Sequence, residues 1–487
     1  MEETVTPQVL HVATEMAPLS KVGGLGDVVG SLPKALRALG VDARVLTPAW
    51  PGVLDRLRDN GAPLLRSRER IHVALRWQVF SARLWRSEWD GTPLFLLDNE
   101  ELFGDAIYPD TLTPDSALPF AFLSFAALEV ARRPGWDATI LHGHDWPAAL
   151  VSVGLQWHRH YRSHRNAFET VLTIHNLAHQ GILSPLVLDE WGLDRRSFSM
   201  EGLEYYGQLN ALKGGIITAD AVTTVSPSYS WEIQKPDGGM GLDGVLTAER
   251  QKLSGILNGL DLDVWNPARD ESLPANFDTS DLRGKTKCRQ ALLKLLGWED
   301  DGRPIACFIG RIVEQKGIDL LLPSLESLVA TGARLVFLGS GFAPFEKALR
   351  ERAARFPHDL AAHIGFSEDL ARLLYGGSDI LLMPSLFEPC GLSQLIALRY
   401  GTVPVVRATG GLADTIIDVD GAPDGYGFLF SDYDPEELIT AFRRAVTLYK
   451  DRKRWTAIQR QGMAKDFSWK ASAQIYLRLY KKLLGLD

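Results

Sequence analysis

Short runs of β-branched and apolar residues alternate along the chain with amphipathic stretches of helical period. This pattern is typical of βαβ units built on a parallel sheet. In the first half, the strands that we expect span residues 8–14, 43–47, 139–142, 170–174 and 221–225. A glycine-rich turn at 22–26 and a helix at 27–39 connect the first two strands. The first half therefore predicts a Rossmann-like α/β domain.

The second half repeats this pattern, which predicts a second Rossmann-like domain. Its expected strands span residues 304–310, 334–339, 380–383 and 402–406. The intervening residues 255–303 carry an Asn-Gly turn at Asn258 and an acidic stretch of low periodicity, so we place the hinge near their start. The last segment, 469–484, has helical spacing and predicts a docked terminal helix. The expected division is residues 1–255, residues 256–464, and a helix at 465–487 that packs back on the N-terminal domain.

Composition and charge exclude several classes of protein. The 487 residues are 46% hydrophobic and 23% charged, which is typical of globular domains and not of disordered or fibrous chains. The formal net charge is −8, so we expect neither nucleic acid nor an anionic membrane surface as the main partner. A local basic pocket for a small anion remains compatible with this charge.

The cysteines and the N-terminal sequence indicate a cytoplasmic protein. Cys288, Cys307 and Cys390 are too few and too scattered for a disulfide framework or a zinc cluster. The chain opens with an acidic segment that runs into a strand, without the basic and apolar regions of a signal peptide. No apolar run reaches the roughly 18–20 residues that span a bilayer.

The glycine-rich turn that carries Lys21 and Gly24 is a candidate anion site. It lies between a strand and a helix, where backbone N–H groups can bind a phosphate and Lys21 would add a positive charge. The spacing of Gly24, Gly26 and Gly30 is not that of a nicotinamide-binding turn, and no acidic residue ends the second strand. A plain turn with a surface lysine remains the alternative.

Arg311 and Lys316 follow the first strand of the second half, and both should emerge at the carboxyl edge of its sheet. Two fixed cations at that edge suit a diphosphate. They could neutralise the charge that develops when a diphosphate leaves, which would replace a divalent metal. The alternative is a solvated loop with an ion pair to Glu314.

Glu388 lies between the strand at 380–383 and a helical pattern that begins near Leu392. A carboxylate there could bind sugar hydroxyls or stabilise a developing oxocarbenium ion. An acid that favours a helix N-terminus is the simpler explanation. One strand later, residues 409–412 form either an anion-binding turn or a tight connection.

Two histidine groups resemble metal-ligand spacings, but we expect no metal at either. His142 and His144 precede Asp145, and His175 precedes His179 by four residues. Both groups follow expected strands, whereas the H-E-x-x-H motif of zinc proteases lies on a helix and carries a glutamate as base.

Taken together, these motifs resemble one family, the bacterial glycogen synthases and plant starch synthases. The matching segments, in the order of the family, are Lys21-Val22-Gly23-Gly24-Leu25, Gly143-His144-Asp145-Trp146, Thr173-Ile174-His175-Asn176, Asn258-Gly259, Gly310-Arg311 to Lys316-Gly317, Tyr375-Gly376-Gly377-Ser378-Asp379, Glu388-Pro389-Cys390-Gly391-Leu392 and Thr409-Gly410-Gly411-Leu412. Residues 97–108 resemble the acceptor-side loop of the family only loosely. The resemblance spans about residues 9 to 415.

The resemblance implies the GT-B fold, with two Rossmann-like domains that face a central cleft. It also implies a retaining enzyme that needs no metal or other cofactor and moves glucose from ADP-glucose to the non-reducing end of an α-1,4-glucan such as glycogen. In the family pattern, Arg311 and Lys316 hold the donor diphosphate, and His175 and Glu388 contact the transferred glucose. The remaining implied contacts are Asp145 and Asn258 in the acceptor and donor cleft, Tyr375 near the adenine, and Lys21, Gly24, Cys390, Gly391, Leu392, Thr409, Gly410 and Gly411 around the donor.

Two other functions remain open from the sequence. A glucan phosphorylase has the same fold but needs pyridoxal phosphate and usually a longer chain. A glucan-binding protein without turnover would not need a diphosphate site, so the presence of Lys21, Arg311, Lys316 and Glu388 opposes it. The sequence does not predict the oligomeric state.

Overall fold

The computed structural model describes residues 6–104, 106–133 and 136–486. The chain divides into two compact units. Unit 1 runs to Gly259 and resumes at Trp469, and unit 2 spans Leu260–Ser468. Both boundaries fall four residues beyond those that we expected from the sequence. Among the described residues, no helix is long and apolar enough to cross a membrane.

Unit 1 is built on a nine-stranded sheet in the order β12-β11-β7-β6-β1-β2-β5-β4-β3. The strands are β1 (Gln8–Val12), β2 (Asp42–Pro48), β3 (Leu65–Leu75), β4 (Gln78–Trp89), β5 (Thr92–Asp98), β6 (Ile140–His144), β7 (Glu169–Ile174), β11 (Ala221–Thr224) and β12 (Leu253–Gly255). The strands from β12 to β5 are parallel, as expected from the alternating pattern. The long strands β3 and β4 extend the sheet in antiparallel fashion, which we did not predict.

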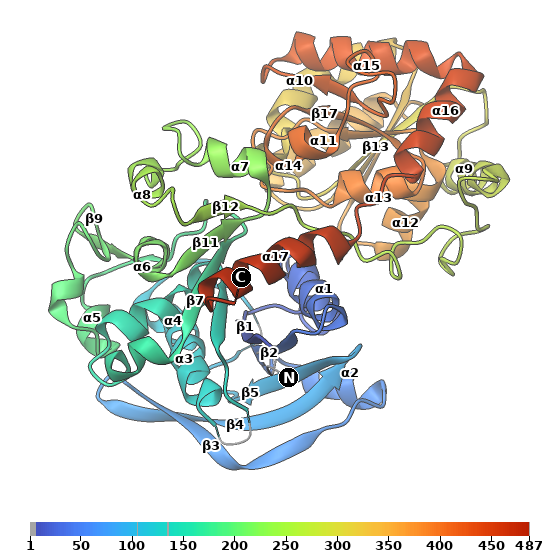
Figure 1. The fold of residues 1–487 in the computed structure, drawn as a ribbon. Helices are drawn as coiled ribbons and strands as arrows, with labels where there is room; N and C mark the ends of the chain where they lie inside the picture. The colour runs from blue at the N-terminus through green and yellow to red at the C-terminus, as the bar shows by residue number, and fades with distance from the viewer. Residues whose placement is uncertain (1–5, 105, 134–135, 487) are drawn as a thin grey trace. The chain divides into compact units, whose positions relative to one another are not determined.

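Helices cover both faces of the unit 1 sheet, and each face packs in its own apolar core. Three helices, α3 (Pro114–Ala131), α4 (Trp146–Trp157) and α6 (Ala211–Thr218), pack together in the larger apolar core with Leu10 and Leu172 of the sheet. Two others, α1 (Gly24–Ala38) and α17 (Trp469–Leu483), lie side by side against Val9 and Ile140 (Figure 1). The C-terminal helix therefore packs on the N-terminal sheet.

The remaining elements of unit 1 are short and line the periphery. They are α2 (Val53–Asp59), α5 (Val187–Glu190), α7 (Pro227–Glu232), α8 (Asp243–Ala248), the 3-10 helices η1 (Tyr161–Ala167) and η2 (Arg195–Ser197), and a three-stranded sheet of β8 (Ile182–Leu183), β10 (Gln208–Asn210) and β9 (Glu204–Tyr205).

Unit 2 is built on a six-stranded parallel sheet in the order β15-β14-β13-β16-β17-β18. Its strands are β13 (Ile305–Ile309), β14 (Arg334–Gly339), β15 (Leu360–Ile364), β16 (Ile380–Met383), β17 (Val403–Arg407) and β18 (Phe428–Phe430). Its helices are α9 (Arg283–Leu296), η3 (Glu314–Lys316), α10 (Ile318–Ala330), α11 (Ala343–Arg355), α12 (Glu368–Gly377), α13 (Ser393–Arg399), α14 (Gly410–Thr415), α15 (Pro435–Tyr449) and α16 (Arg452–Met463).

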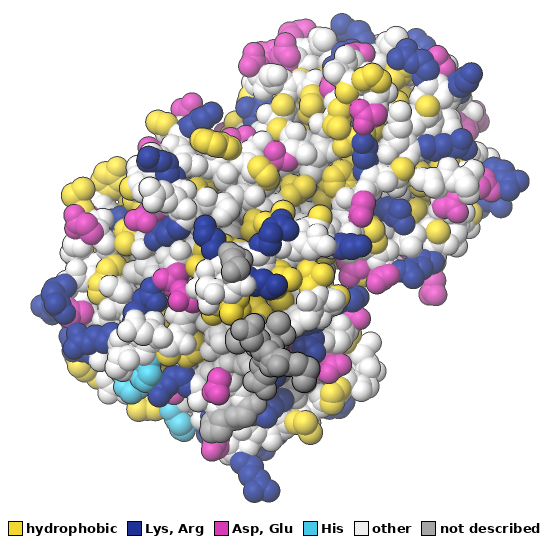
Figure 2. Space-filling view, viewed as in Figure 1, with side chains coloured by type: hydrophobic (Ala, Val, Ile, Leu, Met, Phe, Trp, Pro, Cys, Tyr) yellow, Lys and Arg dark blue, Asp and Glu magenta, His cyan; other side chains and the backbone are white. Residues whose placement is uncertain are grey.

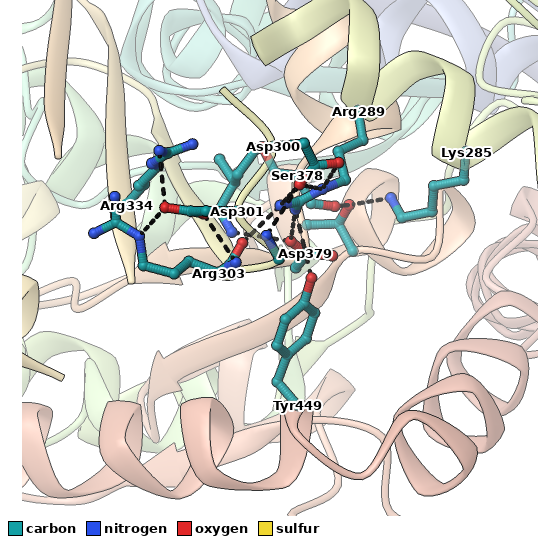
Figure 3. A network of polar contacts seen from close by, with 12 residues as sticks. Lys285, Arg289, Asp300, Asp301, Arg303, Arg334, Ser378, Asp379 and Tyr449 are labelled. Atoms are coloured by element: carbon teal, nitrogen blue, oxygen red, sulfur yellow. Dashed lines mark hydrogen bonds and ion pairs between the residues drawn. The ribbon is translucent and has the colours of Figure 1, made fainter. Parts of the chain in front are cut away.

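Helix α9 lies in the stretch that we interpreted as the region between domains, so that interpretation was incomplete. Its inward face carries charged residues, which explains why the apolar pattern was weak. Arg289 donates to Asp379 at 2.6 Å and to Asp300 at 3.0 Å (Figure 3). The ammonium of the buried Lys285 lies within 3.2 Å of four oxygen atoms, which share its three N–H donors. This polar network fixes the segment that precedes β16.

The charge pattern agrees with an acidic chain that has no extended basic surface on the face shown. Figure 2 shows Lys and Arg side chains intermixed with Asp and Glu over that face of the described residues. Intermixed charges of both signs do not produce an extended positive potential. A protein that binds duplex nucleic acid requires such a potential.

Candidate active site

Within each unit, several of the predicted site residues follow neighbouring strands and so lie at the carboxyl edge of the sheet. In unit 1, Asp145 and His175 follow the adjacent strands β6 and β7, and the turn with Lys21 follows β1, the next strand. In unit 2, Arg311 and Lys316 follow β13, Glu388 follows β16, and Thr409 follows β17. Those three strands are also neighbours in their sheet.

The central feature of unit 2 is an ion pair between Lys316 and Glu388. Nζ of Lys316 lies 2.6 Å from Oε2 of Glu388, and the hydroxyl of Ser385 donates to the same oxygen at 3.1 Å. The Glu388 side chain is only 6% exposed, whereas Lys316 is 21% exposed. A carboxylate held by two donors has little freedom to move, which suits a group that orients a ligand.

Arg311 is the exposed cation of this edge. Its guanidinium donates to the side-chain oxygen of Gln315 at 2.8 Å, one turn further along the same loop. An exposed guanidinium with a neutral partner keeps its charge and most of its donors available for an anion. The expected cation pair is therefore present, with Lys316 anchored and Arg311 accessible.

Glycines at residues 410 and 411 allow the turn after β17 to touch the backbone that carries Glu388. A Cβ built on Gly410 would lie 2.0 Å from the carbonyl oxygen of Glu388, and one on Gly411 would lie 2.1 Å from that of Cys390. Gly410 also has φ of +44°, a conformation that disfavours other residues. The two turns can approach this closely only because neither glycine has a side chain.

This close approach changes the role that we predicted for Gly411. Its N–H donates to the carbonyl oxygen of Glu388 at 3.0 Å, and the N–H of Leu412 donates to Thr409. An amide already bonded to the protein backbone is not a ready ligand for a phosphate. The turn of Thr409, Gly410 and Gly411 therefore supports Glu388 in this structure. The expectation that the amide of Gly411 binds the donor phosphate is corrected, because that amide is bonded to Glu388.

The three residues after Pro389 form the connection into α13. Cys390 is 5% exposed, and the amide of Gln394 donates to the carbonyl oxygens of Cys390 and Gly391 at 3.0 Å each. Gly391 has φ of +74°, and Leu392 precedes the first residue of the helix. The segment is thus held by its own backbone contacts next to Glu388.

In unit 1, the glycine-rich turn already has an anion in place, the carboxylate of Glu15. Oε2 of Glu15 accepts the N–H groups of Val22 and Gly23 at 2.5 and 2.9 Å, and Oε1 accepts the hydroxyl of Tyr108 at 2.7 Å. Glu15 is 2% exposed. The carboxylate therefore shapes the turn from within, and only its remaining amides, such as that of Gly24, are available to an outside anion.

Lys21 carries its charge at the rim of this turn. Its ammonium lies 2.7 Å from a carboxylate oxygen of Asp27, and its side chain is 45% exposed. An exposed pair of this kind is weak and exchanges readily with water or a ligand. Lys21 is therefore able to leave Asp27 for a more strongly charged partner.

Asp145 joins the ends of two adjacent strands. It has φ of +58°, which is strained for a residue other than glycine. Its Oδ1 accepts the N–H of His175 at 2.6 Å and that of Asn176 at 3.4 Å. Burial raises the pKa of the Asp145 carboxyl from 3.8 to about 7, although both N–H groups oppose this shift. A strained backbone and a buried acid of this kind are features that occur often at functional sites, so Asp145 stays a candidate site residue.

A row of buried polar side chains lies on the face of the sheet that α17 covers. His144 Nδ1 lies 3.0 Å from His175 Nε2, and His144 Nε2 lies 3.1 Å from His11 Nδ1. His142 bonds to the hydroxyl of Tyr480 at 2.7 Å and to that of Thr173 at 2.6 Å. Burial lowers the pKa of each imidazole in this row, to about 3 for His11 and His175, so all four are neutral at pH 7.

The histidine row offers a poor metal site, although ring nitrogens of His11, His142 and His144 lie within 4.8 Å of one another. Within the described part of the chain, each of their ring nitrogens except Nε2 of His11 has a hydrogen-bond partner. The rings of His142 and His144 are stacked, with centroids 4.5 Å apart and planes 19° from parallel. Their lone pairs therefore lie in nearly parallel planes and do not converge on one ion.

Asn258, the last predicted residue of unit 1, lies just beyond β12. It is 6% exposed, and its Oδ1 has no hydrogen-bond partner among the residues that the structure describes. An unpaired buried amide oxygen is costly, so it is a candidate contact for a ligand hydroxyl.

Comparison with known proteins relates the whole chain to glucan synthases. Residues 8–248 match the family model described as "Starch synthase catalytic domain", and residues 298–462 match "Glycosyl transferases group 1". Curated glycogen synthases from Anaeromyxobacter sp. and Roseobacter denitrificans are both 44% identical, over 98% of this chain and 99% and 100% of their own lengths. This chain belongs to the glycogen synthase family.

Solved structures agree with this membership. The catalytic domain of starch synthase IV from Arabidopsis thaliana, bound to ADP and acarbose, has a TM-score of 0.91 and 33% identity, with 99% of this chain and 100% of that chain covered. A sucrose-phosphate synthase from Thermosynechococcus elongatus, at 17% identity and a TM-score of 0.61, shares the fold. The glycosyltransferase fold expected from the resemblance, GT-B, is thereby confirmed.

One residue of the glycogen synthase signature lies elsewhere than we expected. Tyr375 is 3% exposed and packs in the core of unit 2, with its ring centroid 6.0 Å from that of Trp265 and 6.2 Å from that of Tyr400. Its carbonyl oxygen accepts Lys285 and Thr402. A ring so deeply buried cannot stack on an adenine, so the predicted place of Tyr375 beside the base is corrected.

The same buried network gives the Tyr-Gly-Gly-Ser-Asp segment of this glycogen synthase a structural role. Gly376 and Gly377 face Cys288 of α9 so closely that a Cβ on Gly377 would lie 2.9 Å from its carbonyl oxygen. Asp379 accepts the N–H of Ile305 at 2.9 Å in addition to Arg289. The segment therefore joins α12 to the central strands and acts through the fold.

Proposed function

We propose that the chain transfers the glucosyl group of ADP-glucose to the non-reducing end of an α-1,4-glucan, with retention of the α configuration. The curated glycogen synthases that match nearly the full length support this reaction. The ADP and acarbose bound to the plant starch synthase support a nucleotide donor and a saccharide acceptor. The Lys316–Glu388 pair is the structural observation that carries the proposal, since it places a cation and a carboxylate together at a sheet edge.

In this proposal, unit 2 holds the donor. Arg311 and Lys316 bind the diphosphate and neutralise the charge that grows on its bridging oxygen as the sugar leaves. The Lys316 ammonium has three N–H donors, and Glu388 accepts only one of them. The other donors allow Lys316 to bridge Glu388 and the departing phosphate. Glu388 then binds hydroxyls of the transferred glucose, on a backbone that Gly410 and Gly411 allow to sit close by.

Unit 1 contributes the groups that contact the transferred sugar and the acceptor. The carbonyl oxygen of His175 is proposed to approach the anomeric carbon, where it stabilises the positive charge of an oxocarbenium-like transition state. Asp145 holds that backbone, since its carboxylate accepts the N–H of His175. Asn258 offers a buried oxygen for a sugar hydroxyl, and Lys21 adds charge for the donor.

Cations in place of a divalent ion make the proposed transfer independent of metal. Glu388 acts in it as an orienting and electrostatic group, with attack on the face of the sugar from which the diphosphate leaves. We place the reaction in the cytoplasm, which the three buried free cysteines support.

The decisive experiment is incorporation of labelled glucose into glycogen, with ADP-glucose and UDP-glucose tested separately and EDTA present. Fast transfer from ADP-glucose alone is the expected result. Equal transfer from both donors would contradict the adenine preference, and no transfer from either by the folded protein would contradict the reaction.

A further inference from the structure

The hydrogen bonds between His175, His144 and His11 form one chain that crosses three adjacent strands. His175 follows β7, His144 ends β6, and His11 lies in β1. The two bonds measure 3.0 and 3.1 Å, and the three side chains are 9%, 0% and 0% exposed. Water therefore has little access to these bonds, and each ring must satisfy its partner from within the protein.

A neutral imidazole carries one proton, so the protons of this chain cannot be placed independently. If His144 carries its proton on Nδ1, it donates to Nε2 of His175 and accepts from Nδ1 of His11. All three rings are then Nδ1–H tautomers. If His144 carries its proton on Nε2, both bonds reverse and all three rings are Nε2–H tautomers.

His11, at the end of this series of hydrogen bonds, decides between the two tautomeric states. Nε2 of His11 is buried and has no hydrogen-bond partner in the described part of the protein. In the Nε2–H state this atom would be an orphaned buried N–H, which folded proteins very rarely contain. In the Nδ1–H state it is only an unshared lone pair, and such acceptors are more often left unsatisfied.

We infer that His11 and His144 are positioning residues that hold His175 as its Nδ1–H tautomer, so that its Nδ1–H is a hydrogen-bond donor for an oxygen of the ligand. The inference rests on the proposed function in taking that ligand to be the transferred glucose. His175 then presents a donor from its ring and, in the proposed reaction, an acceptor from its backbone carbonyl. A sugar hydroxyl can accept the former while the anomeric carbon faces the latter.

The tautomers can be measured directly in the free protein, without any assay of activity. Long-range ¹H–¹⁵N correlation spectra of the whole chain, with histidines labelled, distinguish Nδ1–H from Nε2–H rings. Variants of single histidines assign the signals. We expect Nδ1–H for His11, His144 and His175 at pH 7. Nε2–H signals for His144 and His175 would overturn the inference, whether or not the protein transfers glucose.

A matched pair of variants tests whether the tautomer matters for turnover. In His144→Asn, the amide nitrogen can take the place of Nδ1 and donate to His175, whereas His144→Leu has no donor. We expect His144→Leu to lower kcat about fivefold to tenfold relative to His144→Asn, with a smaller change in KM, and to shift the His175 Nε2 resonance. Equal kcat values and equal His175 spectra in the two variants would overturn the inference.

A control variant separates this effect from damage to the buried row. Tyr480→Phe removes a hydrogen bond from His142. His142 lies next to the three hydrogen-bonded histidines but is not hydrogen-bonded to them. We expect its His175 resonances to match those of the unsubstituted protein. A change of tautomer at His175 in Tyr480→Phe would show that general packing sets the tautomer and would overturn the role of His144.

Discussion

The hydroxyl of Tyr480 lies 2.7 Å from Nδ1 of His142, and this contact joins the C-terminal helix to the centre of the N-terminal sheet. Both side chains are fully buried. Tyr480→Phe keeps the ring in its packing but leaves a buried ring nitrogen without its partner. We expect the free energy of unfolding to fall by about 1–2 kcal/mol.

Urea unfolding at pH 7 measures this change, with Tyr206→Phe as the control because that ring is 84% exposed. We expect the control to change stability by less than about 0.5 kcal/mol. Equal stabilities for the two variants would contradict a structural role for the Tyr480 hydroxyl.

Glu15 shapes the glycine-rich turn, so its removal should affect both the fold and the reaction. Glu15→Ala leaves the N–H groups of Val22 and Gly23 and the hydroxyl of Tyr108 without their acceptor. We expect a loss of roughly 1–3 kcal/mol of stability and a rise in KM for the donor, because the turn that carries Lys21 loses its support. Steady-state kinetics and urea unfolding measure the two effects, and an unchanged KM would contradict the second.

The Lys316–Glu388 pair predicts a large loss of turnover from either side. Glu388→Gln keeps the shape of the side chain and removes the charge, and Lys316→Ala removes the cation. We expect each to lower kcat by about 10²–10³-fold. Lys347→Ala is the matched control, since that lysine is 78% exposed in a surface ion pair of the same unit. Rates near that of the control in either variant would contradict the proposed roles.

The buried carboxyl of Asp145 makes stability depend on pH in a defined direction. Its pKa is about 7 in the folded protein and 3.8 in the unfolded chain, so the folded state binds the extra proton between those values. This carboxyl group does not lower the free energy of unfolding below about pH 4. It lowers the free energy of unfolding progressively as the pH rises from about 4 to about 7. Asp145→Asn cannot ionise and should escape this loss.

Unfolding of Asp145→Asn and the unsubstituted protein between pH 5 and 8 measures the effect. The variant should gain relative stability by at most roughly 1.4 kcal/mol per pH unit up to about pH 7, and then hold a constant difference. A difference in stability that is independent of pH would show that Asp145 is ionised throughout this range.

The sequence was sufficient to predict the strands that carry the site. Parallel strands such as β7 and β16 are short apolar runs, and their residues sit within one or two positions of the expected bounds. Helix α9 was missed because its buried face presents Lys285 and Arg289 in place of apolar residues. The antiparallel pair β3 and β4 was also missed, because its alternation is broken by many exposed charges.

Predicted residues such as Asp145, His175, Lys316 and Glu388 follow the expected strands, but their hydrogen-bond partners were not predictable. Glu15 is near the glycine-rich turn in the chain, yet only the fold shows that its carboxylate points into that turn. His11 and His144 are 133 residues apart, and no local pattern encodes their contact. We predicted Tyr375 near the adenine because of its motif. In the structure its ring is buried in the core of unit 2.

The packing of α17 on α1 has a consequence for the order in which the chain folds. Unit 1 is discontinuous, so the apolar cluster around Val9, Leu32 and Ile140 is completed only after Trp469 and the helix after it have been synthesised. Unit 2 is continuous and can close first, although it comes later in the chain. During synthesis, the apolar residues of unit 1 that α17 covers therefore stay exposed until the C-terminal helix emerges, and exposed apolar surface of this kind favours aggregation.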